Sequence, residues 1–444
     1  MKTSLSKEYT DRSLSDLRSV MSRFSARYPG ETGLRRPVHV VYGGAHLFRF
    51  DTSLKLGKLA AKAFRTYAPD TETFAGLLGL RDDLAETIYK RVGDKLDTEA
   101  IEDLRLDFED GYGIRSDTEE DGHAVSAANE LAKGLAENTL PPFVGFRIKA
   151  FSDEMLERSI RTLDLFLTAL IDATDGKLPN NFVVTLPKVV IAEQVTALAD
   201  ILDEIEAKLD LDAGTIKFEI MVETTASIIG AEGGSALPAM HVAARGRLRG
   251  AHFGAYDYTA ACGITSAYQE LRHQSCDFAR NAMQVALGST GVWLSDGATN
   301  VMPIGPHRGE ELSAEQQLAN TAVVHRAWRL HYDHCRNSLA NGFYQGWDLH
   351  PAQLPTRYAA VYAFFLEGID DASKRLTNFL DAAARATLVG DVFDDAATGQ
   401  GLLNYFLRAV NCGAITENEA TTRSGLTLEE LRSASFATIL NNRK

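Results

Sequence analysis

Short apolar runs alternate with longer amphipathic segments over most of the chain. A run of four to eight apolar and β-branched residues is typical of a buried strand, whereas apolar residues repeated every three or four positions are typical of one helix face. Residues 192–209, for example, keep their apolar residues on one face at helical spacing. The apolar runs predict eight strands, at residues 38–42, 104–108, 143–148, 182–186, 216–222, 250–253, 291–294 and 342–347.

Eight strands that alternate with helices predict a parallel sheet closed into a (β/α)₈ barrel, or TIM barrel, in the α/β class. The connecting helices include residues 153–172, 192–209 and 312–339, and the long segment between the first two strands requires extra helices. Beyond residue 354 the pattern is helical only, at residues 358–367, 371–386, 402–410 and 428–441.

These patterns divide the chain into three parts. We expect an N-terminal helical segment over residues 1–36, the barrel over residues 37–355 and a C-terminal helical extension over residues 356–444. We interpret the extension as packing over a barrel mouth or against another subunit.

Composition narrows the class of protein. The 444 residues are 45% apolar, which is ample for a large core, and the formal net charge of −14 opposes binding to nucleic acid or to an anionic membrane. Cys262, Cys276, Cys335 and Cys412 lie far apart and form no zinc-type motif, so we expect free thiols in a reducing compartment. Residues 1–27 lack the apolar segment of a secretory signal, and no stretch has the ~18 apolar residues of a membrane span. We therefore expect a cytoplasmic protein without a membrane or nucleic-acid partner.

Two acidic residues follow successive strand-like runs. Glu223 comes directly after residues 216–222, and Asp257 lies near the end of the run 248–258. Because the carboxyl ends of all strands meet on one face of a parallel barrel, both carboxylates are expected at the same rim. Mg²⁺ prefers a few carboxylate oxygens together with water and substrate. The sequence thus predicts a metal site on Glu223 and Asp257, although either acid alone would also be explained as a helix cap.

Further charged residues follow the second and third strands. Asp107, Glu109 and Asp110 place three acids within four residues. Like charges this close raise at least one pKa, which suits proton transfer, and the alternative is a solvated acidic turn. The predicted third strand carries Arg147 among apolar residues, and its guanidinium cannot be neutralised in a protein. Its anion is either a structural carboxylate or a substrate carboxylate.

Three more segments could contribute to a site. Lys188 follows the fourth strand, where it could pair with Glu109 or Glu223, bind substrate or form a Schiff base; the structural ion pair is the favoured role. His350 precedes a proline, which favours structural hydrogen bonding over acid–base chemistry. The Gly/Pro-rich basic loop at residues 302–309 follows the seventh strand, where barrels often bind phosphate.

Six motifs, in this order between about residues 38 and 354, resemble the citrate lyase β-subunit and malyl-CoA lyase family. That family belongs to the HpcH/HpaI aldolase (phosphoenolpyruvate/pyruvate barrel) superfamily, and malate synthase shares the overall pattern. The motifs are Asp107-Phe108-Glu109-Asp110, Phe146-Arg147-Ile148, Leu186-Pro187-Lys188-Val189, Met221-Val222-Glu223-Thr224, Phe253-Gly254-Ala255-Tyr256-Asp257-Tyr258 and Gly346-Trp347-Asp348-Leu349-His350-Pro351-Ala352-Gln353.

The resemblance implies a (β/α)₈ barrel with Mg²⁺, or Mn²⁺ as the alternative, on Glu223 and Asp257. It also implies that Arg147 polarises a substrate carbonyl and that Glu109 and Asp110 form an acid pair near the metal. Members of this family act on small carboxylate substrates, and the implied assembly is a homo-oligomer, a trimer or hexamer.

A carboxylate from the C-terminal segment of a neighbouring subunit completes the site in such lyases. Asp394 and Asp395 are the candidates in this chain. Around the metal we expect Thr224, Gly254 and Pro351 to bind substrate together with Arg147.

The activity expected from these residues is a Mg²⁺-dependent carbon–carbon lyase or aldolase that acts through an enolate. Glu109, Asp110, Lys188 and His46 are the candidate catalytic groups beside Arg147. The first strand lacks the short basic segment of CoA-dependent members. A free 2-oxo or 2-hydroxy acid therefore fits as well as an acyl-CoA. The alternatives are phosphoenolpyruvate-type phosphoryl chemistry at the loop 303–309, or a non-catalytic barrel used for ligand sensing or assembly.

Overall fold

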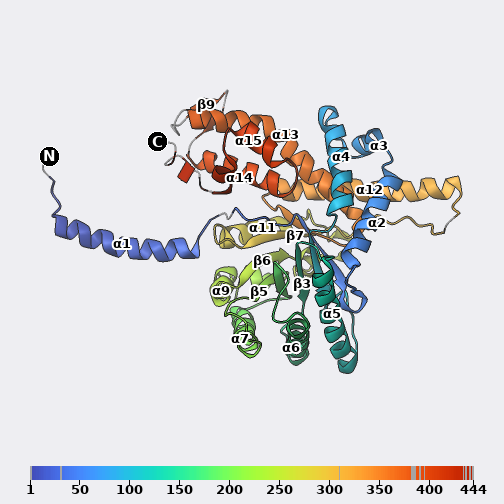
Figure 1. Ribbon diagram of the computed structural model, residues 1–444, viewed down its shortest axis with the longest axis horizontal. Coiled ribbons are helices and arrows are strands. Elements are labelled where there is room, and N and C mark those ends of the chain that lie inside the picture. Colours follow the sequence, from blue (N-terminus) through green and yellow to red (C-terminus); the bar gives the residue numbers. More distant parts are fainter. Residues whose placement is uncertain are drawn as a thin grey trace.

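The structure is a computed structural model that describes residues 3–30, 33–309, 311–381, 387–389, 392–394, 396–433, 435, 438–439 and 442. Its centre is a closed barrel of eight parallel strands in chain order, surrounded by helices (Figure 1). The strands are β1 (His39–Gly44), β2 (Asp103–Asp107), β3 (Phe143–Arg147), β4 (Phe182–Leu186), β5 (Lys217–Val222), β6 (Leu248–Phe253), β7 (Trp293–Ala298) and β8 (Gln345–Asp348). The predicted (β/α)₈ barrel is therefore confirmed.

Each predicted apolar run overlaps one strand, and β7 differs most from its prediction. It continues to Ala298 through Ser295 and Asp296, polar residues that end the apolar run in the sequence. Both side chains are buried, and the Asp296 carboxylate accepts hydrogen bonds from Ser338 Oγ (2.6 Å) and Arg280 Nη1 (3.2 Å). Because these partners lie 42 and 16 residues away in the chain, the local pattern could not reveal that a strand continues here.

Helices cover the outside of the barrel and connect its strands. Three of them fill the long segment between β1 and β2, as predicted. In chain order the connecting helices are α2 (Thr52–Tyr67), α3 (Thr71–Leu78), α4 (Asp82–Thr98), α5 (Asp117–Glu137), α6 (Leu156–Ala173), α7 (Ala192–Lys208), α8 (Thr225–Ile228), α9 (Leu237–Ala243), α10 (Ala255–Ala261), α11 (Gln274–Leu287) and α12 (Ala314–Ala340). Short 3₁₀ helices are η1 (Ala45–Leu47), η2 (Ser266–Tyr268) and η3 (Pro351–Gln353). None of the described helices combines the length and apolarity needed to cross a bilayer.

The interior of the barrel contains buried charges instead of a purely apolar filling. Arg105 Nη2 of β2 lies 2.8 Å from Glu219 Oε2 of β5, and Arg105 also bonds Asp103. Because β2 and β5 are not neighbours, this ion pair crosses the barrel. His252 of β6 brings its Nε2 within 3.0 Å of the same Glu219 oxygen. Such buried charges are tolerated only when each has a partner, so this network fixes the strands relative to one another.

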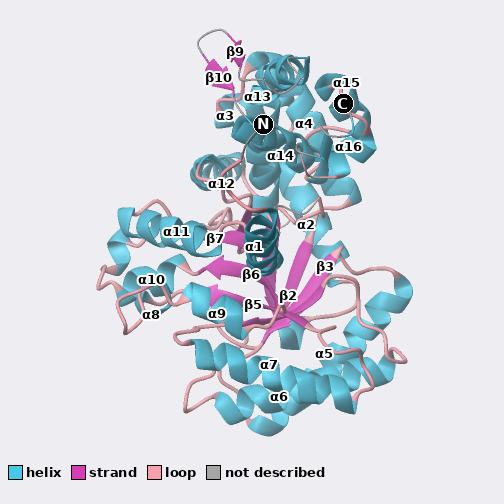
Figure 2. Cartoon of the chain, turned by 90° about the vertical axis from the view of Figure 1, so that its left-hand side faces the viewer, coloured by secondary structure: helices cyan, strands magenta, loops and turns pink. Residues whose placement is uncertain are grey.

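The C-terminal extension packs at the end of the barrel where the strands begin. It contains α13 (Leu354–Asp381), α14 (Ala396–Asn411), α15 (Glu417–Ser424), α16 (Leu428–Arg432) and the strand pair β9 (Thr387–Val389) and β10 (Val392–Asp394). Tyr358 Oη donates to Ala100 O just before β2 (2.9 Å), and Asn411 Nδ2 donates to Leu34 O before β1 (3.4 Å). Figures 1 and 2 show these helices stacked on one side of the barrel.

The helix α13 joins two helices expected from the sequence, at residues 358–367 and 371–386, of which residues 382–386 lie outside the described part of the chain. Gly368 lies inside this helix and does not end it. A Cβ at Gly368 would come within 2.9 Å of Tyr405 Oη on α14. The glycine therefore permits close packing of α14. From the sequence alone, such a glycine is easily taken for the end of a helix.

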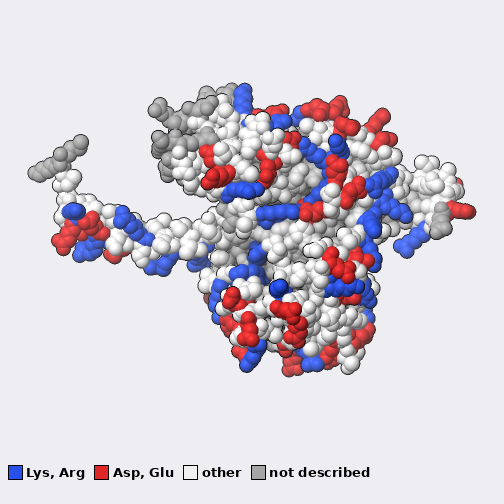
Figure 3. Space-filling model, in the orientation of Figure 1, with Lys and Arg blue, Asp and Glu red and all other residues white. Residues whose placement is uncertain are grey.

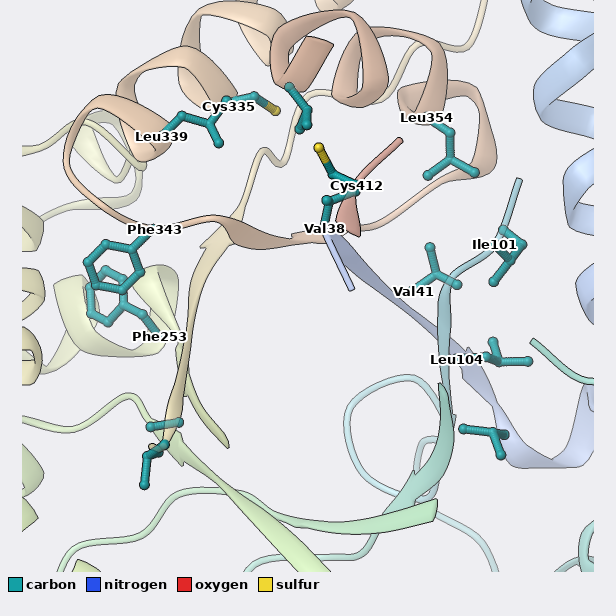
Figure 4. Close-up of a cluster of buried hydrophobic side chains, with 14 of the residues drawn as sticks. Val38, Val41, Ile101, Leu104, Phe253, Cys335, Leu339, Phe343, Leu354 and Cys412 are labelled. Carbon is teal, nitrogen blue, oxygen red and sulfur yellow. The ribbon is translucent and has the colours of Figure 1, made fainter. Parts of the chain in front are cut away.

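A cavity of about 150 Å³ lies between the extension and the barrel. Its walls include Val292 and Tyr344 near the starts of β7 and β8, and Phe365 and Leu407 of the extension. In Figure 4, Val38 before β1 lies next to Cys412 after α14, and both residues line this cavity. The cavity is therefore at the amino ends of the strands.

Glycine at position 145 of β3 is required by the close approach of β4. A Cβ there would lie 2.0 Å from Val183 O, whereas a Cβ at Gly43 in β1 would have no heavy atom within 4 Å. We predict that Gly145→Ala lowers the free energy of unfolding by about 3 kcal/mol, because a backbone carbonyl cannot give way as a side chain does. Gly43→Ala is the matched control, and urea unfolding measures both. Equal stabilities for the two variants would contradict this packing.

Candidate metal and acid–base site

Charged side chains gather where the strands end, on the side of the barrel opposite to the extension. Asp107 and Arg147 are the last residues of β2 and β3, and Glu223 directly follows β5. Lys188 follows β4 by two residues, and Asp257 lies in the first turn of α10 after β6. The expected convergence at one rim is thus built from five consecutive strand ends. Asp257 comes from the following helix and not from the strand itself.

Arg147 is held by Asp107 in a two-point ion pair. Arg147 Nε donates to Oδ1 (2.7 Å) and Nη2 donates to Oδ2 (2.6 Å), and both side chains are almost fully buried. The Asp107 carboxylate also accepts the backbone N–H groups of Glu109 (3.0 Å) and Gly111 (2.7 Å). Of the two anions considered for Arg147, the structural carboxylate is present. Asp107 therefore fixes both Arg147 and the loop that carries Glu109 and Asp110. The sequence interpretation treated these three acids as one group and did not distinguish this structural role.

Glu109 and Asp110 lie between two cations. Lys188 Nζ bonds the Glu109 carboxylate and lies 3.2 Å from Asp110 Oδ1, while Arg147 Nη1 lies 3.0 Å from Glu109 Oε2. Glu109 is 11% exposed and Asp110 is 54% exposed, so only Glu109 is largely shielded from water. Burial raises the pKa of Glu109 above its ordinary value.

Lys188 contacts both of the acids proposed for it. Its side chain pairs with Glu109, and its backbone N–H donates to Glu223 Oε1 (2.7 Å). Burial alone would lower the pKa of Lys188, but the hydrogen bond and charge of Glu109 raise it overall. A lysine with a raised pKa stays an ammonium ion, which disfavours the Schiff-base alternative because that reaction requires a neutral amine.

Two backbone features of adjacent loops position the buried Glu223 carboxylate. Lys188 adopts φ 52°, a left-handed conformation that is uncommon for a residue other than glycine, and it donates its N–H to this carboxylate. A Cβ at Gly254 would lie 2.5 Å from Glu223 Oε2 and 2.4 Å from its Cβ. Gly254 therefore leaves the space that the carboxylate occupies. The sequence predicts that Gly254 binds substrate, and the structure shows that its lack of a side chain makes room for Glu223.

Glu223 and Asp257 form a pair of interacting acids. Burial raises the pKa of Glu223 to about 8, and the negative charge of Asp257 adds to this shift. Asp257 itself is exposed to solvent. Two carboxylates that repel each other, one buried and one open to water, offer hard oxygen donors whose charge a divalent cation would neutralise. Among the described residues no group of three or more His, Cys, Asp or Glu is arranged to hold a metal, so water and substrate would supply the other ligands.

His46 belongs to a separate aromatic group at the same rim. It lies in η1 after β1, with its ring 5.4 Å from that of Tyr112 and 5.9 Å from that of His123. Tyr112 Oη and His123 Nδ1 share a hydrogen bond of 2.7 Å. Burial lowers the pKa of His46, which favours the neutral imidazole. The sequence interpretation did not include Tyr112 and His123. The loop after β2 brings Tyr112 to His46, and α5 brings His123.

Other predicted residues support the rim loops. Thr224 Oγ1 accepts Ser227 N–H (3.1 Å) as the N-cap of α8. Pro351 is buried at the start of η3, and His350 Nδ1 accepts Ala352 N–H (3.1 Å), the structural role favoured for this histidine.

The remaining candidates lie elsewhere. In the loop 302–309, the backbone of His307 exchanges two hydrogen bonds with the Asn320 side chain of α12. Asp394 ends β10 in the extension, and Asp395 lies outside the described residues.

Comparisons with known proteins agree with this fold. The model of a family described as "Domain of unknown function (DUF6986)" matches residues 17–439. No curated protein matches the chain. A citrate lyase structure from Burkholderia xenovorans is 17% identical, with 87% of this chain and 95% of that chain covered and a TM-score of 0.56. The resemblance inferred from the six motifs is therefore confirmed for the fold.

Two further solved structures match with lower TM-scores. A CitE protein from Mycobacterium tuberculosis in complex with magnesium, acetoacetate and coenzyme A is 17% identical, with 85% of this chain and 99% of that chain covered and a TM-score of 0.47. A malate synthase from Haloferax volcanii is 14% identical, with 80% of this chain and 96% of that chain covered and a TM-score of 0.45.

The raised pKa of Glu223 gives the metal-free protein a pH-dependent stability. A group whose pKa rises on folding, here from 4.5 to about 8, stabilises the fold fully below the lower value, and this contribution is lost as the pH rises through the higher one. We predict that the free energy of unfolding of the wild type, measured with urea and a chelator, falls by up to about 4 kcal/mol more between pH 5 and pH 9 than that of Glu223→Gln. The variant stays neutral throughout, so parallel curves for the two proteins would contradict the prediction.

Proposed function

The chain belongs to the DUF6986 family, and we propose that it is a Mg²⁺-dependent carbon–carbon lyase or aldolase acting on a small 2-oxo or 2-hydroxy acid. The observation that carries the proposal is the buried Glu223 carboxylate, held by the Lys188 N–H and by the space at Gly254, with Asp257 beside it. A buried acid kept next to a second acid is unfavourable without a cation. The site is also at the carboxyl ends of the barrel strands, where the ligands of TIM barrels bind.

The residues present fit a hard divalent cation. Glu223 and Asp257 offer only oxygen donors, and Mg²⁺ is typically held by one or two protein carboxylates while it keeps water and substrate ligands. Mn²⁺ accepts the same donors and is the alternative. When bound, the ion supplies a Lewis acid that stabilises the negative charge of an enolate. Citrate lyase, the name of the Burkholderia xenovorans structure, belongs to this reaction class.

Glu109 is the residue to which we assign proton transfer. It is more shielded than Asp110, its pKa is raised, and it touches both Lys188 and Arg147. In cleavage of a hydroxy acid, Glu109 takes the hydroxyl proton while the carbon–carbon bond breaks, and the electron pair of that bond passes to the enolate. Glu109 then returns the proton to the enolate carbon, and the reverse of this last step exchanges the carbon-bound protons of the product. Lys188 stays protonated and holds Glu109 in place. Arg147 keeps a buried positive charge beside the site, where it favours the developing oxyanion.

Metal and substrate binding depend on both acids. We predict that Glu223→Gln and Asp257→Asn each weaken binding of oxalate, an enolate mimic, in the presence of Mg²⁺ by at least about 100-fold, because each removes a proposed metal ligand. Titration calorimetry measures the affinity, and circular dichroism checks that the fold remains. Glu232→Gln, at an exposed position, is the matched control. Wild-type affinity in both Glu223 and Asp257 variants would overturn the metal assignment.

An assay of proton transfer can distinguish the role of Glu109 from that of Asp110. We predict that Glu109→Gln slows Mg²⁺-dependent exchange of pyruvate methyl protons in deuterium oxide by about 100-fold or more, while oxalate still binds. Asp110→Asn is the control at the exposed neighbouring acid, with a smaller effect expected. Proton NMR follows the exchange. If Asp110→Asn loses exchange and Glu109→Gln keeps it, the proton-transfer role belongs to Asp110.

A further inference from the structure

Helix α1 (Lys7–Arg27) extends away from the rest of the molecule, as Figure 1 shows, and none of its residues is buried. Six large apolar side chains on it are exposed, Tyr9 and Val20 among them. The other four are Leu14 (40%), Leu17 (56%), Met21 (48%) and Phe24 (54%). Their spacing of three, four and three residues places them on one face of the helix, and it is the spacing of a coiled-coil seam. We call these four residues the α1 stripe.

A solitary helix of this kind lacks sufficient stabilisation of its own. Helices in water gain most of their stability from packing an apolar face, but no residue of α1 is buried. The ring of Phe24 contacts the ring of Tyr28 just beyond the helix, with the centroids 4.8 Å apart. Five serines within α1 lower its intrinsic helix propensity further. Its local support is the Ser6 cap, whose side chain accepts Tyr9 N–H (3.2 Å). Burial of the stripe by a partner would supply what is missing.

The base of α1 is fixed to the body, so the helix has a defined origin. Gly30 N–H donates to Ser289 O (2.9 Å) in the loop before β7. Arg27 is close enough to His241 of α9 for its positive charge to lower the pKa of that histidine, where burial is the larger cause. This anchor lies away from the acidic rim, so the stripe and the proposed site use different surfaces.

Charge along α1 differs between its two halves. Residues 7–16 carry two basic and three acidic side chains, a net charge of −1, whereas residues 17–27 carry Arg18, Arg23 and Arg27 and no acid, a net charge of +3. Figure 3 shows the acidic side chains near the start of this helix. An antiparallel pair of such helices places each basic half along the acidic half of the other, while a parallel pair would place the two basic halves together.

We propose that α1 is a dimerisation arm, whose stripe packs antiparallel against the same stripe of α1 in a second copy of this chain. The contact is isologous, as in most symmetric dimers, because the same residues of both copies meet. In this register Leu14 faces Phe24 of the second copy, and Leu17 faces its Met21. An anionic membrane is the less suitable occupant, because acids lie in the first half of the helix and the whole chain has a net charge of −14.

Light scattering coupled to size-exclusion chromatography tests the arm on the full chain at micromolar concentration. The wild type is expected to elute with at least twice the mass of one chain. The variant Leu14→Gln/Leu17→Gln/Met21→Gln/Phe24→Gln is expected to elute with half the wild-type mass. The matched control, Ser15→Gln/Ser19→Gln/Ser22→Gln on the opposite face, is expected to keep the wild-type mass. The body should stay folded in every variant because α1 buries no residue against it.

Charge exchange tests the direction of the pair. Replacing Arg18, Arg23 and Arg27 by Glu is expected to weaken the dimer at least tenfold, and adding Glu8→Lys, Asp11→Lys and Asp16→Lys is expected to restore it. A parallel pair would show neither effect.

Two results would overturn the proposal. One is a monomeric wild type, with association to vesicles of phosphatidylcholine and phosphatidylserine then pointing to a membrane as the occupant, and the other is an unchanged mass in the stripe variant. None of these measurements uses activity, so they are independent of the proposed reaction.

Discussion

The hydrogen bond from the Lys188 backbone N–H to the Glu223 carboxylate organises the rim of the barrel. It requires Lys188 to adopt a left-handed conformation, which is unfavourable for a residue other than glycine by about 1 kcal/mol or more. The same conformation leaves the side chain of Lys188 on Glu109 and near Asp110. Lys188 thereby connects Glu223, proposed to bind metal, with Glu109, proposed to move a proton. Strain of this kind persists where the surrounding structure fixes it, and it is concentrated at functional sites.

Buried ion pairs inside the barrel hold the strands that carry this rim. The ion pairs of Arg105 with Asp103 and Glu219 lie in the interior, and the fork between Arg147 and Asp107 lies at the carboxyl ends of β2 and β3. Each buried cation therefore meets its carboxylates at fixed geometry, which limits how far the strands can move. Glu109 and Asp110 then occupy a loop that Asp107 holds through two backbone N–H groups. The buried Asp107, itself paired with Arg147, thus positions Glu109 and Asp110 at the surface of the site.

Local pattern and tertiary contact differ in what they reveal. The barrel could be predicted because parallel strands buried on both sides read as apolar runs. The full length of β7 could not be predicted, because the burial of Asp296 depends on hydrogen bonds from Ser338 of α12 and Arg280 of α11. Glu223 and Asp257 could be singled out from strand-end positions, but the place of Asp257 in α10 and the space at Gly254 depend on the exact path of two loops. The charge of Arg147 predicted a buried anion, and only the fold shows that this anion is Asp107.

The two ends of the barrel serve different purposes. The cavity beneath the extension is walled by residues such as Val292, Tyr344 and Leu407, and it lies where the strands begin. The acids lie where the strands end, and TIM barrels place their chemistry there because the βα loops supply side chains from several strands at once. We therefore interpret the cavity as a gap between two packed layers and assign the chemistry to the acidic rim. Residues before β1 line this cavity, and α1 precedes them in the chain. The arm and the extension therefore both lie at the end of the barrel where the strands begin. Assembly at one end leaves the loops of the other end free to admit a substrate.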